Sequence, residues 1–491
     1  MNSRFISQIS TDSDSREKFF LFLIIVGVIL FYLPFLSRQF IGDDWLWLAN
    51  AKKALNDPNI FIGRPMYGYF RPLNMVVIFL MQTLFGANAS IFSFLSIILH
   101  ATNVFLLWKA LKEYEVAQEI RLISSIIFGF YYLNCSAIEW ISVGHDLWVT
   151  GLMLAFLLLL KKFHKETNVR NFLFLFLTGW AAALFKESGL AALGFYFGYF
   201  LIYRIRPFSK KYWLYSTINI ASYAIFIFLY FITRTNPDKP IELGIPIIIN
   251  IWYFLTYLIM PLAKRIVGGL SGGQLALLKY IKGAVTLFIP AIMAYIYFKG
   301  SKIIKLFVIW PILFLSTVAV FKWGVALFTL YPDYPASRFM YTPFIGMAVC
   351  LAWLFDLIVN RIFRHAAKTI FITGFMALFI VANYLTIWKS SSVFRRQQEI
   401  NQNVINDIQN SWSLFENADS ITVLTNDLAN TEQIISSGEH LPAILFVKFN
   451  KNVPVTVKNA NNDLRPLLGL RHRTLVVGWD IRENRLLIPK N

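Results

Sequence analysis

The sequence predicts an all-α polytopic membrane protein of 11 or 13 transmembrane helices, followed by a small C-terminal soluble α/β domain. Three observations predict this fold class: an apolar composition, a long series of uncharged stretches, and a change to polar composition after Trp388. Of the 491 residues, 57% are hydrophobic and only 15% are charged, whereas soluble proteins carry about 25% charged residues. The excess of apolar side chains therefore requires a lipid environment.

The apolar residues fall into twelve stretches of roughly the length that crosses a bilayer as a helix, which is about 20 residues. They cover residues 19–36, 90–108, 122–138, 147–160, 171–185, 188–203, 212–233, 247–263, 283–298, 306–321, 339–360 and 369–388. A thirteenth stretch, Pro72–Phe85, is too short to span upright and follows Arg71, which favours a helix lying in the membrane interface. Cys135 and Cys350 both lie within apolar stretches, so no disulfide framework is expected.

Short basic loops predict the orientation of the chain in the membrane. The formal net charge of +19 is concentrated in these loops, which is the positive-inside pattern of membrane proteins and argues against a nucleic-acid partner. The loops assigned to the cytoplasm are 161–170, 204–211, 299–305 and 361–368. The remaining loops then face outward: 37–89, 139–146, 186–187, 234–246 and 322–338.

Counting crossings leaves one ambiguity. The loops 234–246 and 322–338 are both assigned to the outside, so the chain between them must cross the membrane an even number of times. It contains three apolar stretches, so one of them is re-entrant or the Gly-rich part 264–282 also crosses. Either solution gives an odd total, with the N-terminus inside and the C-terminus outside. The expected organisation is a cytoplasmic tail at 1–18, a transmembrane domain at 19–390 with its first extracytoplasmic loop at 37–89, and an extracytoplasmic α/β domain at 391–491.

The polar C-terminal region mixes two kinds of pattern. Short alternating or β-branched runs predict strands at Ile421–Leu424, Ala443–Val447 and Leu475–Val477, whereas Glu399–Ser411 has a helical pattern. A small α/β domain explains both.

An acidic pair follows the first apolar stretch, at Asp43 and Asp44. A carboxylate at this membrane edge could act as a general base that removes a proton from an attacking hydroxyl or amine. The alternative is structural, because Asp before a run such as Trp45–Leu55 also suits the N-cap of a helix.

Further along the same loop, Arg64, Tyr67 and Arg71 combine guanidinium groups with aromatic rings. Arginine can bind a phosphate with two parallel hydrogen bonds. Basic side chains that reach from the membrane to its surface give the same pattern, so this alternative stays open.

Three more outward positions carry ionisable residues at a bilayer boundary, where such residues are costly. Glu139, His145 and Asp146 form one group, which could bind a divalent cation, although no metal ligand is assigned. Lys186 and Glu187 form a two-residue connection and could simply be a structural pair. Arg338 precedes an apolar stretch and is a second candidate for binding a phosphate.

The order of these motifs resembles the GT-C superfamily of polyprenyl-phosphate-sugar glycosyltransferases. The branch most similar contains the tetratricopeptide-bearing transmembrane O-mannosyltransferases; protein O-mannosyltransferases and the aminoarabinose transferase of lipid A are more distant. The matching residues are Gly42-Asp43-Asp44, Phe70-Arg71-Pro72-Leu73, Leu84-Phe85-Gly86, His100-Ala101, Ala137-Ile138-Glu139-Trp140-Ile141-Ser142 with Asp146, Phe185-Lys186-Glu187-Ser188, and Ser337-Arg338-Phe339-Met340-Tyr341 with Pro343 and Gly346. This chain lacks the tetratricopeptide repeats, and Phe339-Met340-Tyr341 replaces the usual Tyr-Leu-Tyr.

The resemblance covers roughly residues 19–400 and implies a GT-C-like fold and an inverting transfer of sugar. The donor would be a polyprenyl-phosphate-linked sugar, and the acceptor a glycan, glycolipid or protein outside the cytoplasm, in the bacterial inner membrane. It implies a catalytic acidic residue, acting as the base, at Asp43 or Asp44, and a donor site lined by Arg71 and Asp146. The alternative is an envelope polysaccharide polymerase or a lipid-linked glycan flippase or transporter, but a flippase should carry charges within its spans.

Overall fold

The computed structural model describes most of the chain. The described residues are 3–62, 69–232, 244–259, 272–320, 339–425, 439–460, 468–471, 473–480 and 483–488.

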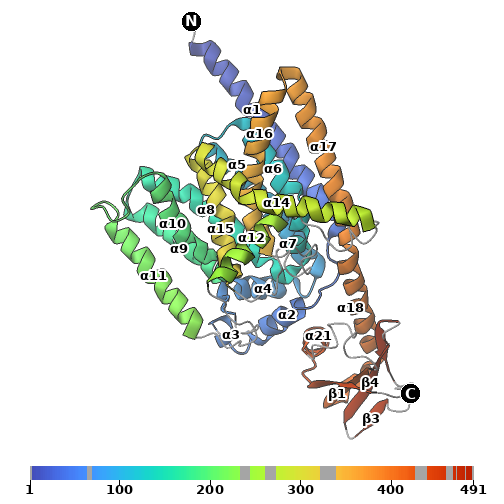
Figure 1. Ribbon diagram of the computed structural model, residues 1–491. Coiled ribbons are helices and arrows are strands. Elements are labelled where there is room, and N and C mark those ends of the chain that lie inside the picture. Colours follow the sequence, from blue (N-terminus) through green and yellow to red (C-terminus); the bar gives the residue numbers. More distant parts are fainter. Residues whose placement is uncertain are drawn as a thin grey trace. The chain divides into compact units, whose positions relative to one another are not determined.

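Helices dominate the structure, and the only strands among the described residues lie after residue 419 (Figure 1). The helices up to the end of the apolar region are α1 (Ser3–Tyr32), α2 (Asp44–Lys53), α3 (Asn59–Ile62), α4 (Pro72–Phe85), α5 (Ala89–Glu113), α6 (Gln118–Phe130), α7 (Cys135–Glu139), α8 (His145–Lys165), α9 (Val169–Phe185), α10 (Ala191–Ile202), α11 (Trp213–Ile232), α12 (Ile245–Ile259), α14 (Gly272–Lys299), α15 (Lys302–Ala319), α16 (Tyr341–Ile362) and α17 (His365–Ser390). Short 3-10 helices lie at Leu33–Phe35, Tyr132–Asn134, Ile141–Val143 and Glu187–Leu190. The C-terminal elements are α18 (Ser392–Asn410), α19 (Trp412–Glu416), β1 (Ser420–Thr425), α21 (His440–Phe449), β2 (Val455–Asn459), β3 (Gly469–Arg471), β4 (Thr474–Asp480) and β5 (Arg485–Leu487).

The chain folds into two compact units. Unit 1 contains Met1–Pro34, Leu95–Ile138 and Val143–Ser390, and unit 2 contains Phe35–Phe94, Glu139–Ser142 and Ser391–Asn491. Unit 2 therefore combines the loop that follows α1 with the polar C-terminal region.

Unit 1 is a bundle of apolar helices. Within the described residues, seven helical runs are long and apolar enough to cross a membrane, or eight if the bent pair Gln118–Phe130 and Tyr132–Glu139 counts as one span. Helix α8 packs along α9, and α16 packs against both α6 and α15. Close contact between α15 and α16 depends on Gly346, because a Cβ there would lie 2.5 Å from the Phe307 carbonyl oxygen. Many large apolar side chains on the outer helices are exposed, such as Phe228 and Leu378, as expected for a lipid-facing surface.

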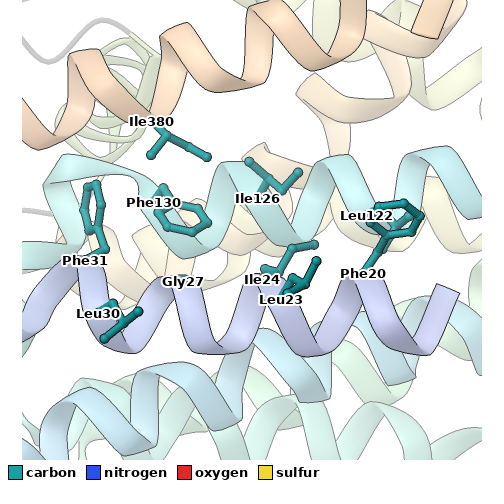
Figure 2. A pocket seen from close by; sticks show the side chains of 10 residues that line it. All are labelled: Phe20, Leu23, Ile24, Gly27, Leu30, Phe31, Leu122, Ile126, Phe130 and Ile380. Carbon is teal, nitrogen blue, oxygen red and sulfur yellow. The ribbon is translucent and has the colours of Figure 1, made fainter. Parts of the chain in front are cut away.

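An apolar pocket of about 580 Å³ lies among α1, α6 and α17. Figure 2 shows Leu23 and Leu30 from α1, Ile126 and Phe130 from α6, and Ile380 from α17 around it. Its ten lining residues are all apolar or glycine. This pocket offers no charged or hydrogen-bonding side chain to a phosphate or a sugar, so the chemistry has to be sought elsewhere.

Unit 2 contains a five-stranded mixed sheet in which β2, β1, β4 and β3 are neighbours and β5 pairs with β4. The pairs β1–β2 and β1–β4 are parallel, and β4 is antiparallel to β3 and β5. A single hydrophobic core joins this region to the first loop, with Trp45 and Leu48 of α2 packed in the same cluster as Leu441 and Leu445 of α21. Burial of such apolar side chains is the main force that holds α2 in place.

The predicted fold class is confirmed: the apolar region is helical and polytopic, and a small α/β region follows it. Each of the twelve predicted apolar stretches overlaps a helix, and the short helix occupies Pro72–Phe85 as predicted. Helix α14 begins at Gly272, so residues 272–282 continue directly into the stretch expected at 283–298. The number of spans and the sidedness of each domain stay predictions.

One predicted strand is wrong, because Ala443–Val447 lies in helix α21. A short, wholly apolar run has no periodicity that separates a buried strand from a buried helix. Pro442 stands in the first turn of α21, where its missing N–H costs no hydrogen bond, and this was the signal for a helix.

Candidate functional site

The acidic pair stands at the start of α2, in unit 2, and its two carboxylates have different environments. Asp44 is buried, with 1% of its surface exposed. One of its carboxylate oxygens accepts the Ile41 N–H at 3.0 Å and the other accepts the Ser142 N–H at 2.6 Å. Asp44 therefore ties the loop that follows α1 to the segment Glu139–Ser142, and neither of these bonds caps α2.

Burial also changes the acidity of Asp44. Removal of the carboxyl from water raises its pKa to about 7, and the negative charge of Asp43 acts in the same direction. The hydrogen bonds from Ile41 and Ser142 oppose this shift without cancelling it. Asp44 thus exchanges its proton near neutral pH, but backbone groups occupy both of its oxygens.

Asp43 is the more accessible member of the pair. It occupies the N-cap position of α2 but makes no side-chain capping hydrogen bond, and 21% of its side chain is exposed. The capping interpretation therefore does not explain Asp43. Its carboxylate oxygen Oδ1 lies 3.5 Å from Nε2 of His440, at the start of α21.

Sequence reasoning missed His440. The residue lies in the polar C-terminal region, far along the chain from Asp43, and no motif surrounds it. The only available signal was that a histidine precedes an apolar run, which is too common to select it. The structure brings it to Asp43 because α2 and α21 share one core.

Glu139 lies in the same unit and is also buried. Its carbonyl oxygen accepts the Ser37 hydroxyl at 2.6 Å, which fixes the backbone. Within the described part of the chain, neither carboxylate oxygen of Glu139 has a hydrogen-bond partner. Buried polar groups are almost always satisfied, so a carboxyl of this kind requires an explanation, and a bound ligand is one.

Arg71 is the N-cap residue of α4, and its guanidinium stacks over the Tyr69 ring at 4.5 Å from the ring centre. Stacking on an aromatic ring is a favourable contact for a guanidinium and orients it. Arg64 and Tyr67, predicted for the same loop, lie outside the described residues.

Unit 1 contains a second polar cluster, centred on Asp146 in the first turn of α8. The Lys186 ammonium lies 2.7 Å from both carboxylate oxygens of Asp146 and 5.0 Å from the centre of the Phe339 ring. Nε2 of His145 lies 3.7 Å from the same carboxylate. Glu187 is half-buried and is the first residue of the 3-10 helix that follows Lys186. Lys186 is thus paired with Asp146, a contact that the sequence did not suggest.

Two further motif residues join in a hydrogen-bonded network inside unit 1. Nδ1 of His100 lies 2.7 Å from the Tyr341 hydroxyl, and the other ring nitrogen lies 3.0 Å from the Gly129 carbonyl oxygen. The Asn103 amide donates to the Tyr341 hydroxyl and to the Leu147 carbonyl. These contacts connect α5, α6, α8 and α16, which gives the His100 and Tyr341 motifs a structural role.

The predicted site residues thus fall into two groups. Asp43, Asp44, Arg71 and Glu139 belong to unit 2, whereas His145, Asp146, Lys186 and Glu187 belong to unit 1. Arg338 and the loop 322–338 lie outside the described residues. Convergence of all these groups on one cavity stays a prediction. No set of three or more His, Cys, Asp and Glu side chains among the described residues is arranged to hold a metal ion, so nothing here favours the divalent cation.

These features define a class: a multi-pass helical membrane protein with an acidic cluster in a second unit. No protein-family model matches the sequence, and no curated protein matches it. Solved structures do resemble it. The crystal structure of ArnT from Cupriavidus metallidurans in the apo state aligns at a TM-score of 0.49 and 11% identity, over 93% of this chain and 92% of that one.

The ArnT structure bound to undecaprenyl phosphate aligns at a TM-score of 0.43 and 13% identity, over 77% of this chain and 72% of that one. The archaeal oligosaccharyltransferase AglB from Archaeoglobus fulgidus, in complex with an inhibitory peptide and a dolichol-phosphate, aligns at 0.47 and 11% identity. That alignment covers 89% of this chain and 64% of AglB. At this level of similarity we draw no conclusion about activity from these structures.

Proposed function

We propose that this protein is an inverting glycosyltransferase that moves a sugar from a polyprenyl-phosphate carrier to an acceptor outside the cytoplasm. The observation that carries the proposal is Asp43, a partly exposed carboxylate at a helix N-cap position that makes no capping bond. It stands in the loop where the motif resemblance puts the catalytic carboxylate. The buried carboxyl of Glu139 in the same unit supports a ligand site there.

In the proposed reaction, Asp43 acts as the general base. The acceptor oxygen or nitrogen forms a bond to the anomeric carbon, and its proton passes to the Asp43 carboxylate. The bond between the anomeric carbon and the phosphate oxygen breaks, and its electron pair stays on the polyprenyl phosphate. Attack from the side opposite the leaving phosphate inverts the anomeric configuration.

Positive charge is needed where the phosphate departs. Arg71 supports this role because its guanidinium is oriented by the Tyr69 ring, and arginine binds phosphate oxygens through two parallel hydrogen bonds. We propose the same role for Arg64 and Arg338. Tyr67, Glu139, His145, Asp146, Lys186 and Glu187 are proposed to line the site.

The test is release of polyprenyl phosphate by the purified protein in detergent or nanodiscs. The probes are undecaprenyl-phosphate hexoses and pentoses that carry a labelled sugar, with an envelope extract as the source of acceptor. Asp43→Asn should lower the rate about 10²- to 10⁴-fold, the typical contribution of a general base. A transfer rate near that of the wild type in Asp43→Asn would exclude Asp43 as the base.

A matched control is Asp57→Asn in the same loop. Asp57 is exposed, and its side chain accepts the Asn59 N–H at 3.1 Å, a bond that asparagine can keep. This variant should transfer sugar at the wild-type rate. Absence of lipid-phosphate release by the wild type with every donor would favour the polymerase or flippase alternative.

A further inference from the structure

We infer that His440 is a positioning residue, supplied by the C-terminal region, which orients the Asp43 carboxylate for catalysis. The inference rests on the proposed function, because it assigns to His440 an effect on the proposed base. It also gives the C-terminal region a part in the reaction.

The first step is the geometry of the pair. His440 has no exposed surface, and its Nε2 lies 3.5 Å from Oδ1 of Asp43, whose side chain is partly exposed. One edge of the carboxylate therefore faces a buried imidazole. Contacts of this kind are often long in the absence of substrate and tighten when it binds.

The second step is the rigidity of the frame that holds the two residues. The Lys52 ammonium donates to the Phe446 carbonyl oxygen at 2.7 Å, and Lys448 lies over the Trp45 ring. Leu441 and Leu48 lie in the core that α2 and α21 share. Because α2 and α21 are fixed to each other along their lengths, the N-terminus of each is fixed as well.

The third step is what the contact achieves. A carboxylate at a partly exposed N-cap position can rotate about its side-chain torsions, and only one orientation presents an oxygen to the acceptor. An imidazole N–H that closes on Oδ1 when substrate binds would favour one rotamer of this side chain, so that the carboxylate meets the acceptor in one orientation. Misplacement of a reacting group by about 1 Å costs up to about 10²-fold in rate.

A packing role alone explains His440 less well. Burial of a histidine without use of its polar ring costs stability relative to an apolar side chain of similar size. The neighbouring positions of α21 in the shared core are filled by leucine, alanine and isoleucine, so an apolar residue would serve packing at His440 equally well.

The experiment compares two substitutions by steady-state kinetics on the full-length protein, with the same undecaprenyl-phosphate sugars. His440→Phe keeps a ring of similar size but removes the N–H groups, and we expect kcat to fall about 10- to 100-fold with little change in KM for the donor. His440→Gln retains a donor and should keep most of the activity. In an Asp43→Asn background, His440→Phe should cause no further loss, because the two residues act as a unit.

Leu475→Ala separates positioning from packing, because Leu475 is a buried core residue of the same unit that lies in β4, outside α2 and α21. This variant should lower the melting temperature at least as much as His440→Phe yet keep kcat. Wild-type kcat in His440→Phe, while Asp43→Asn is inactive, would overturn this inference alone. An additive loss in the double variant would overturn it too. Failure of the wild type to release lipid phosphate would instead overturn the proposed function, and the inference with it.

Discussion

The ion pair between Asp146 and Lys186 allows a quantitative test of unit 1. Their side chains are only 5% and 3% exposed, and the ammonium lies 2.7 Å from both carboxylate oxygens. Asp146→Asn removes the negative charge 2.7 Å from the buried ammonium, and Lys186→Met removes the positive charge 2.7 Å from the buried carboxylate. Each single change should lower the free energy of unfolding by about 3–5 kcal/mol, the usual cost of an uncompensated buried charge.

The double variant, Asp146→Asn with Lys186→Met, is the decisive comparison. It removes both charges together, so the desolvation cost disappears with the attraction, and we expect it to be within about 2 kcal/mol of the wild type. The assay is denaturant unfolding of the detergent-solubilised protein, followed by tryptophan fluorescence. Asp419→Asn is the control, because Asp419 pairs with Arg473 at 3.2 Å in an exposed position, where loss of a pair costs less than about 1 kcal/mol.

Two results would refute this reasoning. Wild-type stability in Asp146→Asn would show that Lys186 does not depend on Asp146 for its charge compensation. A double variant as unstable as the sum of the single variants would show that the two residues act separately.

Gly346→Ala should destabilise the protein by about 1–3 kcal/mol, because the new Cβ would lie 2.5 Å from atoms of α15. Gly374→Ala, where the new Cβ would meet no neighbouring atom within 4 Å, should be nearly neutral in the same unfolding assay. The pKa of Asp44 is higher in the folded state than in the unfolded state, so the folded protein holds this proton more tightly. The free energy of unfolding should therefore fall by up to about 4 kcal/mol as the pH rises from about 4 to about 7. A variant Asp44→Asn should lack this component of the pH dependence, and equal slopes for the two proteins would contradict the shift. A reporter fused after Asn491 should be active only outside the cytoplasm, and activity only inside would reverse the predicted topology.

The helices of the apolar region were predictable because composition alone specifies them. A lipid-facing segment must satisfy its backbone internally, so a long uncharged stretch becomes a helix. Pro72–Phe85 was predictable even at its ends, where Pro72 stands at the first position and Gly86 follows with positive φ.

The candidate site was predictable only in part. The acidic pair and the Asp146 cluster stood out because ionisable residues at a membrane edge are costly. Their different environments could not be predicted from the sequence. The Asp44 carboxylate accepts the N–H of Ser142, and the Asp43 carboxylate lies beside His440. Both contacts join parts of the chain that are remote in sequence, and no local pattern records them.

The division of unit 2 among three chain segments has a consequence for biosynthesis. The apolar side of α2, with Trp45 and Leu48, is translated early, but its partners on α21 come about 400 residues later. At typical elongation rates of about 5–20 residues per second, the first loop waits for about 20 seconds or longer with an uncovered apolar face. A chaperone or insertase that shields this loop while the later helices enter the membrane would therefore raise the yield of active protein.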